Sequence, residues 1–303
     1  MGPPSAVARL PREPGVYRFR DARGQVLYVG RATTLRSRVA SYWSDLRDRR
    51  HLAPMVARVA RVEAVACGSA HEAAWLERNL LEQALPQWNR TPGGQESEVY
   101  IRLDTRPAAP GLTVVHVRQH TAGAEHFGPY LGGQRVRQAV SGLGRIRPLG
   151  YSGALTGSRL DIARARGFSA ADPARLASDL TAILRREPAA AAAARADLER
   201  LRDRASQALG FELAGRIQDE IQALAWLTCP QRVTVADGGD LDVYGWADGM
   251  LVCFGVRGGR LCRWSQRGCG EHRAAAHLAA TPPAWAAFAQ HNAELAAALA
   301  APA

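Results

Sequence analysis

The feature that most constrains the fold is a pair of short aromatic–glycine strings near the start of the chain. Residues Gly15–Tyr17 and Tyr28–Gly30 are each typical of a strand, and the turn-prone segment Asp21–Gly24 lies between them. Two strands joined by so short a connection predict a β-hairpin. Such a hairpin brings the phenol hydroxyls of Tyr17 and Tyr28 close to one another on a small sheet.

A helix signal follows the hairpin directly. Thr33 or Thr34 can serve as its N-cap, because a side-chain hydroxyl accepts a hydrogen bond from the first helical turn. Apolar residues then recur every four positions, at Leu35, Val39 and Trp43, which predicts one buried helix face.

A third strand and a longer helix complete the predicted unit. The strand is expected over residues 62–67, and the helix over about 71–85, with Ser69 as its N-cap and Pro86 as its stop. We therefore predict an α/β (α+β) domain over residues 10–95. Its sheet is three-stranded, mainly antiparallel and flanked by helices.

The longer helix carries one charged residue within its apolar stripe. Glu77 falls on the face formed by Ala73, Leu76, Leu80, Leu81 and Ala84. A carboxylate there must be paired, protonated or bound to a cation, because an unpaired buried charge is very costly. Two interpretations stay open: a hard divalent cation with oxygen ligands, or an ion pair with a nearby arginine.

Arg38 and Tyr42 lie one helical turn apart on the first helix, beside its apolar stripe. They can project together toward the strands that carry Tyr17 and Tyr28. Taken singly, each residue has an ordinary interpretation, since strand tyrosines usually pack and helix arginines usually face solvent. Taken together with Glu77, these side chains indicate a site that cuts phosphodiesters.

The charge of the chain favours a polyanionic partner such as DNA. The formal net charge is +11, and all 39 basic side chains are arginines, which bind phosphate with two parallel hydrogen bonds. A basic surface without a nucleic-acid role is the alternative. Arg36, Arg47, Arg49 and Arg50 are candidates for weak contacts with the DNA backbone, and a solvated basic loop is the alternative for them.

Cysteine usage indicates a reducing compartment. The five cysteines form no regular framework and no closely spaced pair, so a disulfide-bonded or zinc-binding protein is not expected. Cys262, Cys269 and His272 are the one conceivable metal-ligand group. No signal segment and no run of membrane-spanning length is found, so we expect a soluble, cytoplasmic protein without a membrane partner.

The rest of the chain divides by composition into three further segments. Residues 96–195 form a mixed region, strand-rich at first and Ala-rich later. The sequence pattern predicts a helical hairpin over residues 196–226, with a break at Gly210. It predicts a short β-rich segment with an Ala-rich helical tail over residues 230–303. A hairpin of this size needs a partner surface or a neighbouring domain to bury its apolar stripes.

The residues singled out above stand in the order of the GIY-YIG nuclease signature, and the chain resembles the UvrC-type members of that family. The signature residues are Gly15, Tyr17, Tyr28, Gly30, Arg38, Tyr42, Glu77 and Asn89. Further UvrC-like stretches are residues 27–32, 76–80, 127–130, 211–221 and 241–245. The resemblance extends in colinear order over most of residues 10–265.

The resemblance implies metal-dependent hydrolysis of a DNA phosphodiester, with Glu77 as the ligand of Mg²⁺ or Mn²⁺. Tyr17 would position or deprotonate the attacking water, with support from Tyr28. The base role requires nearby cations, because a phenol has an ordinary pKa of about 10.

The remaining signature residues are expected to serve charge and orientation. Arg38 would stabilise the developing negative charge, with Arg31 close to the scissile phosphate. Tyr42 and Asn89 would orient the site. Arg31 stands where UvrC-type proteins usually have lysine, a change that keeps the charge but not its geometry, so reduced activity is expected.

The hairpin resembles the UVR motif, which implies a UvrB-like helicase as partner. Phe211, Ala214, Ile217 and Ile221 are the candidate contact residues. The implied function is a nick on the 3′ side of damaged DNA, made together with that partner. A non-cleaving UvrB-binding adaptor and a stand-alone GIY-YIG nuclease are the alternatives.

Two departures from the UvrC pattern limit what the resemblance implies. We expect neither the RNase H-like nuclease nor the helix-hairpin-helix modules, and so only one incision. We also expect no iron–sulfur cluster, because the sequence has no cysteine between Cys67 and Cys229 to ligate one.

Overall fold

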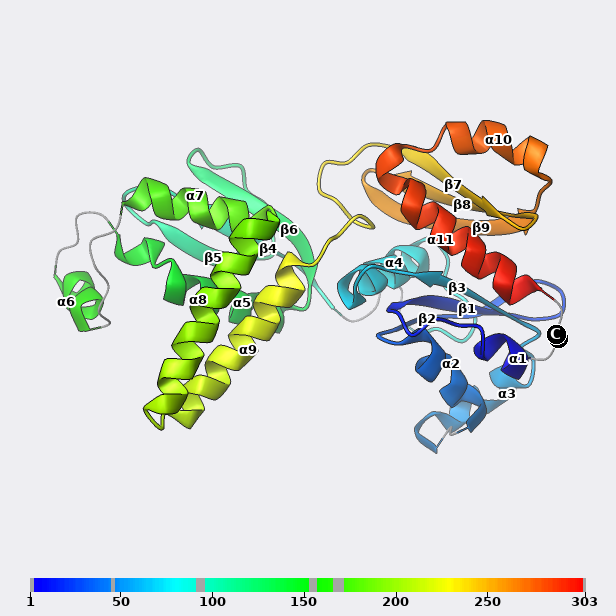
Figure 1. Cartoon of the computed structure of the whole chain (residues 1–303), viewed down its shortest axis with the longest axis horizontal. Coiled ribbons are helices and arrows are strands. Elements are labelled where there is room, and N and C mark those ends of the chain that lie inside the picture. The colour runs from blue at the N-terminus through cyan, green and yellow to red at the C-terminus, as the bar shows by residue number, and fades with distance from the viewer. Residues whose placement is uncertain (1–2, 45–46, 91–95, 153–156, 166–171, 302–303) are drawn as a thin grey trace. The chain divides into compact units, whose positions relative to one another are not determined.

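The computed structural model describes residues 3–44, 47–90, 96–152, 157–165 and 172–301. These residues form two compact units. Unit 1 combines Met1–Gln95 with Pro230–Ala303, and unit 2 comprises Glu96–Cys229. Each unit contains its own antiparallel sheet structure and its own helices (Figure 1).

The first sheet of unit 1 is the predicted hairpin with a third strand added. Strands β1 (Gly15–Arg20), β2 (Val26–Ala32) and β3 (Arg61–Ala66) are antiparallel and run in the order β2-β1-β3. The turn between β1 and β2 is held by Asp21, whose carboxylate accepts hydrogen bonds from two backbone amides of the turn. The predicted fold class of this segment is confirmed.

Helices cover this sheet. They are α1 (Pro3–Val7), α2 (Leu35–Ser44), the 3-10 turn η1 (Arg47–Leu52), α3 (Ala53–Val56) and α4 (Ala70–Gln83). Leu35 and Val39 of α2 are fully buried, as the four-residue spacing predicts. Ser69 caps α4 by accepting a hydrogen bond from the Glu72 amide, which confirms the predicted start of that helix.

The C-terminal segment, residues 230–303, packs onto this first sheet. Its strands β7 (Leu241–Ala247), β8 (Met250–Arg257) and β9 (Arg260–Gly268) form an antiparallel sheet, followed by α10 (Glu271–Ala279) and α11 (Pro283–Ala300). Helix α11 contacts β3 as well as β7 and β8, while α4 contacts both β2 and β9 (Figure 1). The sequence pattern treats this segment separately, whereas the structure shows one compact unit.

The packing explains a polar residue in an otherwise apolar helix. Strand β3 is an edge of its sheet, so its outer backbone groups need partners. The buried Asn292 of α11 supplies them, because its amide accepts from the Ala66 N–H at 2.7 Å and donates to the Ala66 carbonyl at 3.2 Å. The edge of the first sheet is therefore covered by the C-terminal segment.

Unit 2 is a three-stranded sheet covered by helices. Its elements are β4 (Glu98–Asp104), β5 (Gly111–Val115), β6 (Ala124–Leu131), α5 (Gly133–Ile146), η2 (Leu149–Tyr151), α6 (Ser158–Ala165), α7 (Pro173–Leu184), α8 (Pro188–Gln207) and α9 (Phe211–Thr228). Helices α8 and α9 form the predicted hairpin, which packs on α5. The Ala-rich tract belongs to α8, so the hairpin begins earlier than expected.

The apolar residues of the hairpin divide into two groups. Ile217 and Ile221 are buried in the core of unit 2, so the expectation that they contact a partner is corrected. Their stripe is used within the unit, where α5 and α8 cover it. Phe211, by contrast, is 65% exposed, together with Leu209 at 74%. Ala214 is half-buried.

None of the helices in the described part of the chain is long and apolar enough to cross a membrane.

Candidate active site

Three tyrosines converge where β1, β2 and α2 meet. The hydroxyl oxygens of Tyr17 on β1 and Tyr42 on α2 lie 2.8 Å apart, within hydrogen-bond distance. The ring of Tyr28 on β2 lies 6.3 Å from that of Tyr17 and 6.2 Å from that of Tyr42, centre to centre. The predicted meeting of these phenols is therefore observed.

Phe19 and the signature glycines complete this aromatic cluster. The ring of Phe19 lies 5.3 Å from that of Tyr17 and 5.0 Å from that of Tyr42. Sequence reasoning did not single out Phe19, although side chains two positions apart on a strand share one face. Gly30 faces Tyr17 across the β1–β2 pair, and Gly15 approaches the Val65 carbonyl so closely that a side chain has no room.

The surroundings raise the pKa of two of these phenols, Tyr17 and Tyr28. Burial raises the pKa of Tyr17 well above its ordinary value, and the neighbouring phenols Tyr42 and Tyr28 raise it further. Burial is also the largest cause that raises the pKa of Tyr28, and the neighbouring Tyr42 phenol and Glu77 carboxylate raise it further. Arg38 lowers both pKa values but is outweighed, so the net shift is opposite to the one that a base role of Tyr17 requires.

Arg38 adds a positive charge beside the phenols. Its guanidinium carbon lies 5.7 Å from the ring centre of Tyr42, in a cation–π arrangement. Burial alone lowers the pKa of Arg38, but the neighbouring phenols Tyr17 and Tyr42 outweigh burial and raise it above its ordinary value. The side chain therefore stays cationic, as a group that binds a phosphate must.

Glu77 projects from α4 toward β2, where it meets Arg31. One carboxylate oxygen accepts a hydrogen bond from the Arg31 amide at 3.1 Å, and the other lies 3.3 Å from the Arg31 Nε. The side chain is 21% exposed, so Glu77 lies at the border of the apolar stripe and not within it. The ion-pair interpretation is observed, and a cation has access to the carboxylate.

Asn89 holds the strand that carries Tyr28. Its side chain accepts a hydrogen bond from the Val29 N–H at 3.0 Å and donates one to the Val29 carbonyl at 2.8 Å. Val29 stands between Tyr28 and Gly30, at the centre of the second aromatic–glycine string. The amide thereby substitutes for a neighbouring strand and fixes the backbone of the site.

The predicted DNA-backbone arginines have different surroundings. The Nε of Arg36 donates to the Leu10 carbonyl at 2.7 Å, so this side chain is partly committed to the fold. Arg50 is exposed. The side chains of Arg47 and Arg49 lie outside the described residues.

Cysteine and histidine clusters were the other metal candidates. Within the described ranges, no group of three His, Cys, Asp or Glu residues is placed to hold a metal ion. Cys262 is buried with its thiol beside the Gly255 carbonyl, and Cys269 is buried with its thiol beside the Gly270 carbonyl.

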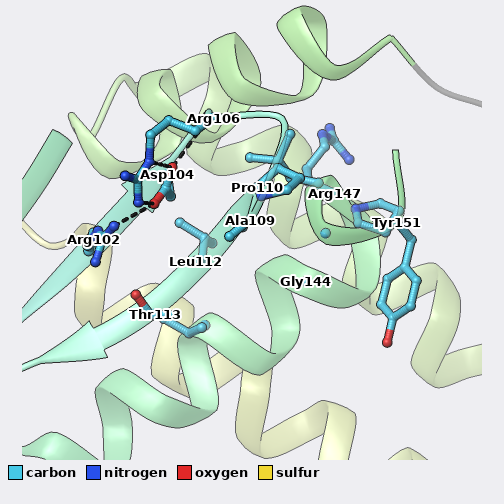
Figure 2. Close-up of a pocket in the computed structure, with 15 residues that line it drawn as sticks. Arg102, Asp104, Arg106, Ala109, Pro110, Leu112, Thr113, Gly144, Arg147 and Tyr151 are labelled. Atoms are coloured by element: carbon cyan, nitrogen blue, oxygen red, sulfur yellow. Dashed lines mark hydrogen bonds and ion pairs between the residues drawn. The ribbon is translucent and has the colours of Figure 1, made fainter. Parts of the chain in front are cut away.

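Unit 2 contains a cavity of about 500 Å³ with several arginines in its wall (Figure 2). Asp104 pairs with Arg106 at 2.6 Å and with Arg102 at 2.5 Å, and these hydrogen bonds lower the pKa of the Asp104 carboxyl. Arg147 is likewise paired, with two aspartates. Carboxylates thus pair with the arginines in the wall of this cavity.

Comparison with known proteins relates these features to one family. Residues 13–90 match the model of the UvrC-like GIY-YIG domain. UvrABC system protein C of Mycobacterium tuberculosis is 32% identical over 279 residues, which is 84% of this chain and 42% of that protein. The same protein of Mycobacterium sp. (strain KMS) is 33% identical, over 84% of this chain and 40% of that protein. The chain thus spans less than half the length of these curated relatives.

Among solved structures, two forms of one domain are similar to the first part of the chain. The GIY-YIG N-terminal endonuclease domain of UvrC from Thermotoga maritima, bound to magnesium as its catalytic divalent cation, is 28% identical, with a TM-score of 0.26. A point mutant of the same domain is 26% identical, with a TM-score of 0.27. Each match covers 29% of this chain and 94% of the other.

Proposed function

Because the chain contains a UvrC-like GIY-YIG domain over residues 13–90 and is a homologue of UvrABC system protein C, we propose that it is a metal-dependent DNA endonuclease of the excision-repair type. One observation carries the proposal. The Glu77 carboxylate and the Arg38 guanidinium both lie near enough to the Tyr28 phenol to act on its pKa, and Glu77 also accepts a hydrogen bond from the Arg31 amide of the same strand, β2.

Glu77 is the residue that would hold the divalent cation. Its carboxylate is part-exposed, and a single carboxylate suits Mg²⁺ or Mn²⁺, which keep several waters. When bound there, the cation would supply Lewis-acid stabilisation of a phosphate oxygen. Arg31, 40% exposed, can turn from Glu77 toward a phosphate.

The other side chains bind and orient the phosphodiester. Arg38 offsets the negative charge that develops on the phosphorus oxygens. Tyr28 is part-exposed and can hydrogen-bond the attacking water. Tyr17 has no exposed surface, so we assign it to holding Tyr42 and the hairpin in place, which revises the expectation that Tyr17 itself contacts the water.

We also propose a UvrB-like partner and a nick on the 3′ side of the lesion. The support for a partner is the exposed tip of the α8–α9 hairpin, where Leu209, Phe211 and Leu213 present apolar surface to solvent. Exposed apolar clusters of this kind mark sites of protein association. The same tip would serve a non-cleaving adaptor, so binding alone does not decide between the two functions.

The deciding experiment maps nicks on a lesion-bearing duplex labelled at each end. Parent protein is incubated with Mg²⁺, with Mn²⁺ or with EDTA, and with or without a purified UvrB-like helicase. We expect a single nick on the 3′ side of the lesion that requires both metal and helicase. Binding to the helicase without any nick would support the adaptor. Nicking that depends on neither the lesion nor the helicase would support a stand-alone nuclease.

A further inference from the structure

Helix α4 carries Glu77 on one face and is held by the C-terminal segment on the other. The helix contacts both β2 and β9 (Figure 1), with Glu77 bonded to Arg31 of β2 and Asn79 bonded to Arg260 of β9. Trp75, Asn79 and Glu82 share the face toward β9, because residues three, four and seven apart lie on one side of a helix. Glu77 points about half a turn away from that face.

Asn79 is the buried centre of this contact. The side chain has a relative exposure of 1%, so each of its polar atoms needs a partner. Its Oδ1 accepts from the Nε and an Nη of Arg260 at 3.0 and 2.9 Å, and its Nδ2 donates to the Thr234 hydroxyl at 2.9 Å. Both partners belong to the C-terminal segment.

Arg260 extends the contact along the helix. The same guanidinium donates to the Glu82 carboxylate at 2.8 Å and lies 5.6 Å from the ring centre of Trp75. The planar guanidinium of Arg260 thus contacts three side chains that span two turns of α4, which restricts both the rotation and the sliding of this helix. The start of the helix is held as well, since the buried Glu72 accepts from the Arg232 amide at 2.8 Å.

We propose that Asn79 and Arg260 are positioning residues for Glu77, through which the C-terminal segment sets the place of the metal-binding carboxylate. The inference rests on the proposed function insofar as Glu77 is the metal ligand. A turn of α4 by a small angle moves Glu77 relative to Tyr28 and Arg38, and residues that orient a metal ligand typically contribute about 10- to 100-fold to affinity or activity.

The test compares Arg260→Ala and Arg260→Lys with Arg267→Ala, an exposed arginine of the same strand that serves as the matched control. Two quantities are measured: the Mn²⁺ concentration for half-maximal nicking, and Mn²⁺ affinity by electron paramagnetic resonance without DNA. Arg260→Ala should raise the half-maximal Mn²⁺ concentration and lower the Mn²⁺ affinity, each by about 10-fold. These changes should be larger than its effect on the nicking rate at saturating Mn²⁺. The Arg260→Lys variant should show values between those of the parent and Arg260→Ala, since a single ammonium cannot bind the Asn79 and Glu82 oxygens together as the guanidinium does.

Amide hydrogen exchange of residues 75–82 gives a readout that needs neither metal nor DNA. It should be faster in Arg260→Ala than in the parent and unchanged in Arg267→Ala. If Arg260→Ala does not fold, Thr234→Val, which removes only the hydroxyl that Asn79 reaches, replaces it with the same expectation.

Unchanged Mn²⁺ affinity and unchanged exchange in the Arg260 variants would overturn the inference, even where the parent cuts DNA. Conversely, a parent protein that nicks no DNA refutes the proposed function. In that case weaker Mn²⁺ binding and faster exchange in Arg260→Ala would still support the positioning role.

Discussion

Gly30 lies directly against the phenol of Tyr17: a Cβ at residue 30 would come within 2.5 Å of the Tyr17 hydroxyl oxygen. The two residues are also partners in the β1–β2 register. The glycine of the second aromatic–glycine string is thus required by close packing at the site. This contact gives a structural reason for a glycine at position 30, opposite Tyr17.

Gly30→Ala should displace the Tyr17 ring and break its hydrogen bond to Tyr42. Overpacking of this kind costs about 1–3 kcal/mol of stability, and a displacement of about 1 Å at a site can cost about 100-fold in rate. Nicking rate and thermal unfolding are measured together. Gly239→Ala is the control, because a Cβ there meets no atom within 4 Å. Parent-like activity in Gly30→Ala would show that the contact is dispensable.

Asn89→Ala should loosen the strand that carries Tyr28. The substitution leaves the Val29 N–H and carbonyl without their side-chain partner, at a cost of about 1–3 kcal/mol. Asn89→Asp should keep the hydrogen bond from the Val29 N–H, because a carboxylate accepts. It should lose the hydrogen bond to the Val29 carbonyl, because a carboxylate cannot donate. Both variants are compared with Gln87→Ala, an exposed neighbour, in unfolding temperature and nicking rate. Equal behaviour of all three would contradict the assigned role.

Phe211→Ala and Ile217→Ala should separate partner binding from folding. Phe211 is exposed, so its truncation should leave stability unchanged and weaken binding to a purified UvrB-like helicase by about 10-fold or more. Ile217 is buried, so its truncation should cost about 2–5 kcal/mol of stability instead. Titration calorimetry and chemical denaturation measure the two effects. Unweakened binding by Phe211→Ala would remove the hairpin tip from the partner surface.

Asp104 should make unit 2 sensitive to acid. Hydrogen bonds from Arg106 lower the pKa of this carboxyl in the folded protein, so its stabilising effect is present above the unfolded pKa of about 3.9. That effect is lost as the pH falls through the lower folded-state value. Asp104→Asn should therefore be less stable than the parent at pH 7, with a difference that narrows below about pH 4. Hydrogen exchange of β4 and β5 against pH measures this, and a constant difference would contradict it.

Local sequence signals predicted the first half of unit 1 well. The hairpin followed from the alternating strings and the turn at Asp21–Gly24, and α4 from the capping serine Ser69. The convergence of Tyr17 and Tyr42 followed from strand and helix periodicity. These features depend on residues near one another in the chain, which is where such patterns carry information.

Contacts between distant segments were not predictable in this way. Arg260 meets Asn79 across 181 positions, and Asn292 meets Ala66 across 226. No periodicity specifies which sheet an amphipathic helix will cover. For the same reason the pattern left open whether a partner or a neighbouring domain covers the apolar stripe with Ile217. The resemblance to the UVR motif assigned that stripe to a partner, but α5 of the same unit covers it.

The most direct test of the central claim is metal-dependent nicking by Glu77→Gln. The substitution keeps the size of the side chain and removes the charge that a divalent cation needs, while the part-exposed pair with Arg31 contributes only about 0–1 kcal/mol to stability. Glu199→Gln, on the surface of α8, is the control. With Mg²⁺ or Mn²⁺ and a lesion-bearing duplex, we predict that the parent and Glu199→Gln nick DNA while Glu77→Gln, equally stable, does not. Nicking by Glu77→Gln at the parent rate would contradict the account.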